Sequence, residues 1–145
     1  MEFLQGSGIA IDQGVQVDEF LRSNFDDIYA AGDVAQAKDF STGGFRLQAI
    51  QPTAVDHAQI ATRNMIKGHH YPHRGNINMN VLDTMGLISS SFAQWMGVAG
   101  GESTSLVDKD GYRYLNLQFQ DDVLIGASSL GLTEHVGALR GLIQS

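Results

Sequence analysis

SNFDDIYAAGDVA, residues 23–35, is the most informative stretch of this 145-residue sequence. Residues 28–31 form a short apolar run that stops at Gly32-Asp33, and such a run predicts a buried strand leading into a loop. Small residues at a strand end let another molecule approach the backbone closely. A carboxylate at that point can accept a hydrogen bond from a sugar-type hydroxyl group. By itself Gly-Asp is a common turn pair, so the same pattern also describes a buried strand followed by a turn in which Asp33 is solvated.

The flanking segments predict local structure on both sides of this stretch. Residues 9–11 and 15–17 are β-like and are expected to flank a hairpin turn at residues 12–14, and residues 38–44 predict a loop. A helix is expected from about Pro52, which suits a first turn, to Lys67, with Gly68 placed to end it. Its apolar side is expected to hold Ala54, Val55, Ala58, Ala61, Thr62 and Met65.

The second half of the chain predicts an antiparallel sheet closed by a helix. One or two strands are expected in residues 79–91, followed by a meander of residues 105–107, 112–119 and 123–128. Asp110-Gly111 is a strong hairpin signal, and residues 120–122 make the second turn. Thr133 is expected to cap a closing helix with Val136, Leu139 and Ile143 on its apolar side.

The predicted fold class is therefore α/β passing into α+β. Residues 1–72 are expected to hold strands and one helix, and residues 73–145 a small α+β domain. The polar junction of residues 69–78 sets this boundary. Because the first part lacks sheet partners, its apolar surface should be hidden by self-association, and we expect a homo-oligomer.

Residues 23–35, together with the approach VQVDEFLR at residues 15–22, resemble the second FAD fingerprint of the pyridine nucleotide-disulfide oxidoreductase superfamily. The helix start AIQPTAV, residues 49–55, resembles the next element of that family. Residues 75–80 and 110–127 are similar to the small C-terminal, interface-type domain of the NADH-dependent nitrite reductase and rubredoxin reductase branch. The resemblance implies that the chain is the C-terminal part of such a protein.

The resemblance also implies a site. FAD would be contacted by the turn at Gly32 and Asp33, with Asp33 on the ribityl chain, and by the helix start at Gln51, Pro52, Thr53 and Ala54. There the positive end of the helix favours the negative charge on the reduced ring. Many relatives have an aromatic residue where this chain has Gln51. The implied function is electron transfer from NAD(P)H through FAD to an unidentified acceptor.

Two features separate this sequence from a complete enzyme. No Gly-rich phosphate loop for FAD or NAD(P)H is present in the 145 residues, so the chain by itself is expected to be inactive. No residue is a good candidate for proton-transfer catalysis, and no His-Pro…Glu base of the dithiol reductases occurs. The alternative function is a non-catalytic partner-binding or dimerisation module derived from a flavoprotein tail.

Composition excludes several other classes. The formal net charge of −7, without a basic run, disfavours nucleic acid as a partner. No apolar stretch is long enough to cross a bilayer. With no cysteine there is no disulfide or redox dithiol, which is compatible with the cytoplasm, the expected location.

Two motifs invite a metal interpretation and are expected to bind none. His69, His70 and His73 lie within five positions but have no accompanying carboxylate or cysteine, which favours a solvated loop. Asp121-Asp122 lies in the second hairpin turn, where two adjacent carboxylates are usually solvated.

Overall fold

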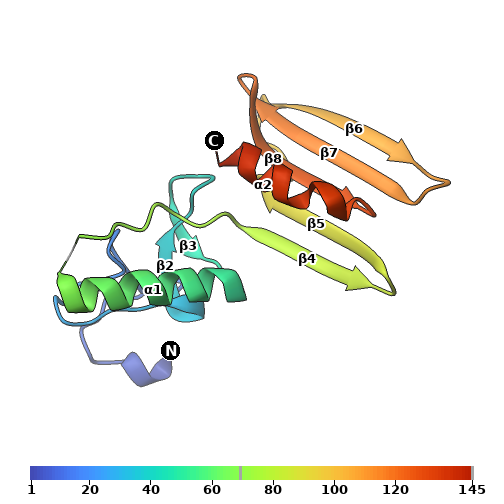
Figure 1. Cartoon of the computed structure of the whole chain (residues 1–145). Helices are drawn as coiled ribbons and strands as arrows, with labels where there is room; N and C mark the ends of the chain where they lie inside the picture. Colours follow the sequence, from blue (N-terminus) through green and yellow to red (C-terminus); the bar gives the residue numbers. More distant parts are fainter. Residues whose placement is uncertain (69, 145) are drawn as a thin grey trace. The chain divides into compact units, whose positions relative to one another are not determined.

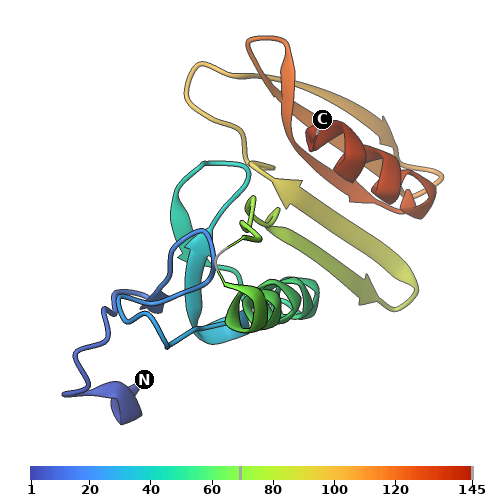
Figure 2. The same cartoon turned by 60° about the vertical axis from the view of Figure 1, so that its left-hand side comes forward.

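A computed structural model describes residues 1–68 and 70–144 of the chain. The chain divides into two compact units, Met1–Asn76 and Ile77–Ser145, each with its own sheet and helix (Figures 1 and 2). The expected passage from an α/β-type segment to an antiparallel α+β unit is confirmed. The division into domains expected at residues 72 and 73 stays a prediction. No helix in the described part of the chain combines the length and apolar character needed to span a membrane.

The first unit is a small three-stranded sheet with one long helix. Its strand order is β1 (Val15–Gln16), β2 (Ala35–Lys38), β3 (Phe45–Leu47), with β1 parallel and β3 antiparallel to β2. The 3₁₀ helices η1 (Glu2–Leu4) and η2 (Gly32–Val34) complete it, together with α1 (Gln51–Lys67). In Figure 1, α1 lies beside β2 and β3. The core consists of Val15, Val17, Leu21, Ala35, Ala37 and Ala61.

Two expectations for the first unit are wrong. Residues 28–31 form no strand, since only Tyr29 makes an isolated bridge, with Arg22. The backbone there bonds to the preceding bend instead: the Ala30 N–H donates to the Leu21 carbonyl at 3.1 Å. The hairpin expected at residues 9–17 is reduced to a bridge between Ile11 and Val15, because β1 pairs with β2, a strand that the sequence pattern did not predict.

Helix α1 has the expected bounds but buries a different face. Gly68 ends it with φ 77°, which favours glycine. The predicted apolar side is largely wrong, since Val55 and Met65 are 51% and 58% exposed. Of the predicted residues Ala61 is buried, and it shares the buried face with Thr53, His57 and Asn64. Polar side chains can occupy this face because loops supply hydrogen-bond partners there.

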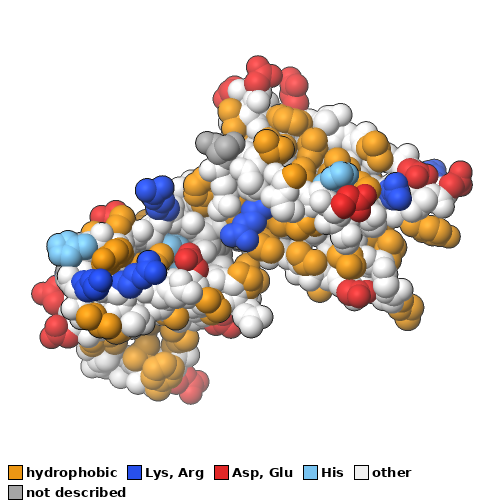
Figure 3. Space-filling model, viewed as in Figure 1, with side chains coloured by type: hydrophobic (Ala, Val, Ile, Leu, Met, Phe, Trp, Pro, Cys, Tyr) orange, Lys and Arg blue, Asp and Glu red, His pale blue; other side chains and the backbone are white. Residues whose placement is uncertain are grey.

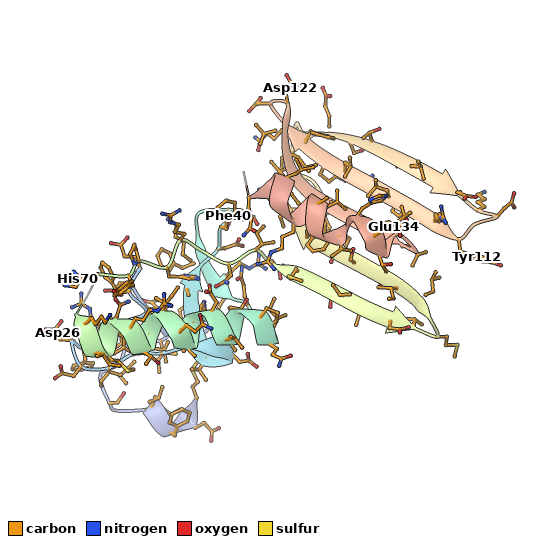
Figure 4. All side chains as sticks on the ribbon, viewed as in Figure 1. Asp26, Phe40, His70, Tyr112, Asp122 and Glu134 are labelled. Atoms are coloured by element: carbon orange, nitrogen blue, oxygen red, sulfur yellow. The ribbon has the colours of Figure 1, made fainter. Side chains whose placement is uncertain are left out.

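The second unit is a five-stranded antiparallel sheet in the order β4-β5-β8-β7-β6 (Figure 1). Its strands are β4 (Met79–Thr84), β5 (Leu87–Ala93), β6 (Glu102–Asp108), β7 (Arg113–Gln120) and β8 (Val123–Leu130). The predicted strands and both meander turns are confirmed. Tyr112 and Asp122 mark these two turns, at opposite ends of the sheet (Figure 4). Asp121 and Asp122 have φ of 50° and 64°, the backbone of a two-residue hairpin turn.

The closing helix α2 (Val136–Ile143) packs on this sheet. Leu139 is buried with Phe92 and Ala127, and Val136 and Ile143 pack against the same cluster, so the predicted apolar side of the helix is confirmed. The predicted cap is wrong: Thr133 begins the 3₁₀ helix η3 (Thr133–His135), and the α-helix starts after His135 without a side-chain cap.

Candidate functional site

The six residues expected to contact a cofactor lie in two elements of the first unit that pack together, η2 and the first turn of α1. Gly32 and Thr53 are buried and Ala54 is half-buried. Asp33, Gln51 and Pro52 are exposed. The exposed carboxylate of Asp33 makes no hydrogen bond or ion pair with any residue that the structure describes. Its acceptor atoms are therefore available to a ligand.

Gly32 is the point of closest approach between the two elements. Its φ is 72°, and a Cβ atom there would lie 3.2 Å from the Cβ of Ala54. Any side chain would therefore combine backbone strain with crowding against the helix. The turn can hold Asp33 beside the helix start only because residue 32 is glycine.

The start of α1 has no side-chain cap. The N-cap residue is Ile50, with extended backbone, and no side chain bonds to the first turn. The Ala54 N–H donates to the Ile50 carbonyl at 3.1 Å, whereas Pro52 has no N–H. The N–H groups of Gln51 and Thr53 precede the first helical hydrogen bond, so the helix cannot satisfy them itself. An uncapped helix start of this kind favours a negatively charged or electron-rich ligand.

Behind the turn lies a buried polar cluster that the sequence analysis did not identify. His57 and His73 are 2% and 3% exposed, with ring centroids 4.7 Å apart at an interplanar angle of 89°. The Gly32 N–H donates to Nδ1 of His57 at 3.3 Å. His73 Nε2 and Asn76 Oδ1 are 2.5 Å apart, and Asn76 Nδ2 donates to Asp56 Oδ2 at 3.0 Å. The cluster therefore connects Gly32 to α1 and to the segment that follows the helix.

Burial determines the charge of both imidazole rings. It is the main reason why the pKa of His57 is lowered to about 4, and the neighbouring His73 lowers it further. Burial likewise lowers the pKa of His73. Asn76 and Asp56 act in the opposite direction on both rings but do not outweigh desolvation. Both rings are accordingly neutral at pH 7.

The same face of α1 carries a second buried polar anchor. Asn64 is 1% exposed; its Nδ2 donates to the carbonyls of Phe20 and Tyr71 at 3.1 and 2.9 Å. Its Oδ1 accepts the Tyr71 N–H at 3.0 Å. The one signal for this face in the sequence is the helical spacing of Thr53, His57 and Asn64, which a search for apolar residues passes over.

The histidines near the junction form no metal site within the described residues, where no group of three or more His, Cys, Asp or Glu side chains could hold an ion. His70 is exposed, whereas His73 is buried inside the first unit. His69 falls outside the part of the chain that the structure describes. The solvated-loop interpretation is therefore wrong for His73.

Two solved structures with a similar fold are oxidoreductases. The NAD-dependent persulfide reductase from A. fulgidus matches with a TM-score of 0.83 at 20% identity, over 99% of this chain and 30% of that one. The NADH:rubredoxin oxidoreductase from Clostridium acetobutylicum matches with a TM-score of 0.73 at 17% identity, over 99% and 35%. At these identities the two likenesses establish the fold of the chain.

Sequence comparison agrees with the resemblance. Residues 1–64 match the family described as "Pyridine nucleotide-disulphide oxidoreductase". A curated relative, the "NADH-dependent phenylglyoxylate dehydrogenase subunit epsilon" of Aromatoleum evansii, is 29% identical over 123 residues, which are 84% of this chain. The chain spans 29% of the length of that relative.

Proposed function

We propose that this chain provides the flavin-contacting turn, the adjoining helix start and the small C-terminal unit of an FAD-dependent NAD(P)H oxidoreductase. The observation that carries the proposal is the juxtaposition of Gly32-Asp33 with the uncapped start of α1, in a segment that matches an oxidoreductase family. The proposal assigns no chemical class to the electron acceptor of the full-length protein.

The residues present fit such a cofactor. Asp33 offers an exposed carboxylate with free acceptor capacity, suited to the hydroxyl groups of a ribityl chain. The N–H groups of Gln51 and Thr53, with the positive end of the helix dipole, suit an electron-rich ring. Bound FAD would accept a hydride from NAD(P)H and pass its electrons onward. The chain's own part is to bind, orient and stabilise negative charge.

Removing the carboxylate tests the site. In the full-length protein, Asp33→Ala should weaken FAD binding by about 1.5–3 kcal/mol, roughly ten- to hundred-fold, through loss of a charge-assisted hydrogen bond. Fluorescence titration of the apoprotein with FAD measures the dissociation constant. Asp27→Ala is the matched control, since Asp27 is another exposed carboxylate in the same segment. An FAD dissociation constant that is equal in all three proteins would remove Asp33 from the site.

The 145-residue chain by itself is proposed to be inactive, because its sequence contains neither Gly-rich phosphate loop. NADH oxidation by the purified chain in the presence of FAD, followed with an artificial dye acceptor, is the test. We expect no turnover above that of free FAD. Turnover that depends on the chain would contradict this part of the proposal.

A second candidate, a non-catalytic partner-binding or dimerisation module, is favoured by exposed apolar side chains. In the first unit Phe45 is 51% and Ile66 75% exposed, and Figure 3 shows hydrophobic side chains at the surface. We also propose that this chain self-associates and that the protein works in a reducing compartment such as the cytoplasm. Light scattering tests the self-association, and we expect dimers or larger species.

The flavin content of the full-length protein distinguishes the two candidate functions. A yellow protein supports the enzyme, and a colourless protein supports the module.

A further inference from the structure

The buried histidine pair behind the cofactor turn has no role in the function proposed above. His57 projects from the second turn of α1, and His73 from the segment that follows this helix. Each ring has one buried nitrogen without a hydrogen-bond partner among the described residues, Nε2 of His57 and Nδ1 of His73. A buried nitrogen without a partner costs free energy of folding. We expect the hydrogen bonds of the other two nitrogens, Nδ1 of His57 and Nε2 of His73, to offset this cost.

The bond from Gly32 fixes the protonation state of His57. Because the Gly32 N–H donates to Nδ1 at 3.3 Å, Nδ1 must present a lone pair. A neutral ring with a lone pair on Nδ1 carries its proton on Nε2. Protonation of Nδ1 would replace this hydrogen bond by a contact between two donors and release the turn.

Burial and the neighbouring His73 oppose that protonation, whereas Asp56 on α1 and Asn76 in the following segment favour it less strongly. Lys38 on β2 also faces the pair and opposes a charge on His73. Asn76 Nδ2 is used by Asp56, so Oδ1 of Asn76 receives the proton of His73 Nε2. The backbone N–H of His73 donates to the Glu19 carbonyl at 2.6 Å. His73 is thereby held in place, and it presents its ring edge-to-face to His57.

We propose that His57, as the neutral tautomer with its proton on Nε2, is a positioning residue that holds the Gly32-Asp33 turn against α1 in the orientation that presents the Asp33 carboxylate to the cofactor. The proposal rests on the proposed function only in its last clause. Gly32 immediately precedes Asp33 and has a φ of 72°. Because glycine has no side chain, no packing of residue 32 itself holds this backbone conformation. A hydrogen bond from α1 to this N–H is therefore the direct restraint on the direction of Asp33.

Nitrogen-15 NMR of the 145-residue chain tests the restraint without a cofactor. The expected wild-type result is a pyridine-type Nδ1 and a pyrrole-type Nε2 for His57 at pH 7, with a coupling or correlation between Nδ1 and the Gly32 amide. This state should persist well below pH 6.5. A His57 ring protonated at Nδ1 at pH 7, or a Gly32 amide that does not sense the ring, would overturn the proposal.

Three substitutions separate positioning from mere packing. In His57→Asn the amide oxygen replaces Nδ1, so the bond to the Gly32 N–H is retained, whereas His57→Gln places its oxygen near the former Nε2 and His57→Leu has no acceptor. Hydrogen exchange of the Gly32 amide should accelerate about tenfold in the Gln and Leu variants and less in the Asn variant. Equal exchange in all three variants would contradict the positioning role. The wild-type tautomer measurement stands even where a variant fails to fold.

FAD binding tests whether His57 affects the cofactor site. In the full-length protein, His57→Gln and His57→Leu should weaken FAD binding about tenfold, and His57→Asn should restore most of it. If the Gly32 amide responds to His57 but neither His57→Leu nor Asp33→Ala changes FAD binding, the proposed function fails while the restraint holds. If Asp33→Ala weakens FAD binding and the His57 variants do not, the positioning role fails.

Discussion

Helices α1 and α2 each cover a small sheet in their own unit, but their buried faces differ in chemistry. Helix α1 buries Thr53, His57 and Asn64, whereas α2 buries Leu139 and packs Val136 and Ile143 against the sheet. Apolar packing tolerates small shifts because it is not directional. Hydrogen bonds to fixed partners are directional and tolerate only small shifts of the helix. A polar buried face would therefore hold the start of α1 in place at the proposed binding site.

Breaking the apolar unit should have the largest effect. Gly126 lies in β8 against the backbone of residues 94–95, and a Cβ atom there would lie 2.6 Å from the Trp95 N. Because a backbone cannot move aside like a flexible side chain, Gly126→Ala should destabilise the second unit by about 4 kcal/mol or more. Trp95 is the single tryptophan, so its fluorescence in urea follows this unit. Gly141→Ala, with open space around it, is the control and should not lower stability.

Breaking the polar face of α1 comes next. Asn64→Asp keeps the shape of the side chain but loses the two donors that serve the Phe20 and Tyr71 carbonyls. We expect the first unit to lose about 3–4 kcal/mol, since buried acceptors would face a carboxylate. Circular dichroism of the helix during urea unfolding measures the loss.

Gln59→Glu makes the same chemical change at an exposed position of the same helix and should alter stability by less than about 0.5 kcal/mol. An Asn64→Asp protein as stable as this control would show that the polar face contributes nothing.

Lowering the pH should destabilise the first unit through its two buried histidines. The unfolded chain binds a proton at His57 near the ordinary pKa of about 6.5, whereas the folded pKa is about 4. Stability of the first unit should therefore be unaffected by this group above pH 7, fall as pH drops through 6.5, and level off near pH 4. The loss from His57 reaches about 3 kcal/mol, and His73 adds to it in the same direction.

Urea unfolding at several pH values, followed by the helix signal, measures this loss. His57→Asn should shrink it, because the variant removes one of the two titrating rings. A wild-type curve that is flat from pH 7 to 5 would mean that the rings are not neutral in the folded chain.

The smallest expected effect concerns helix α2 of the second unit. Gly137 lies in α2 with nothing near its missing Cβ, so Gly137→Ala should stabilise the second unit by about 0.5–1 kcal/mol through helix propensity. Trp95 fluorescence again reports it. A loss of stability would indicate that α2 needs the smaller residue for its packing on the sheet.

Local rules predicted most of the second unit from sequence. Asp110-Gly111 defines a turn, and the alternation of Leu115 and Leu117 defines the face that packs against α2. The first unit followed these rules less well. Strand β2 was missed although Ala35–Lys38 alternates in size and polarity, because it has only four residues and consists largely of Ala and Lys, which are depleted in strands. The buried face of α1 was missed because its polar residues are stabilised by partners distant in sequence, such as Phe20 with Asn64.

The candidate site was partly visible in the sequence. Gly32, Asp33 and the helix start at Pro52 could be selected by their pattern, and the fold brings η2 and α1 into contact. His57 and His73 could not be paired in advance, because their edge-to-face contact depends on how the segment after Gly68 returns along the helix. A histidine in an otherwise ordinary helix carries no signal of its partner.

The strand order of the second unit constrains the moment at which it can fold during synthesis. Strand β5 leaves the ribosome with β4 as its neighbour, but its other partner is β8, with Ala93 opposite Gly126 and Ser89 opposite Leu130. Until β6, β7 and β8 have emerged, one edge of β5, which includes Phe92, has no strand to pair with. A nascent chain stalled in the β6–β7 region would expose that edge, which makes it a natural point of capture by a chaperone.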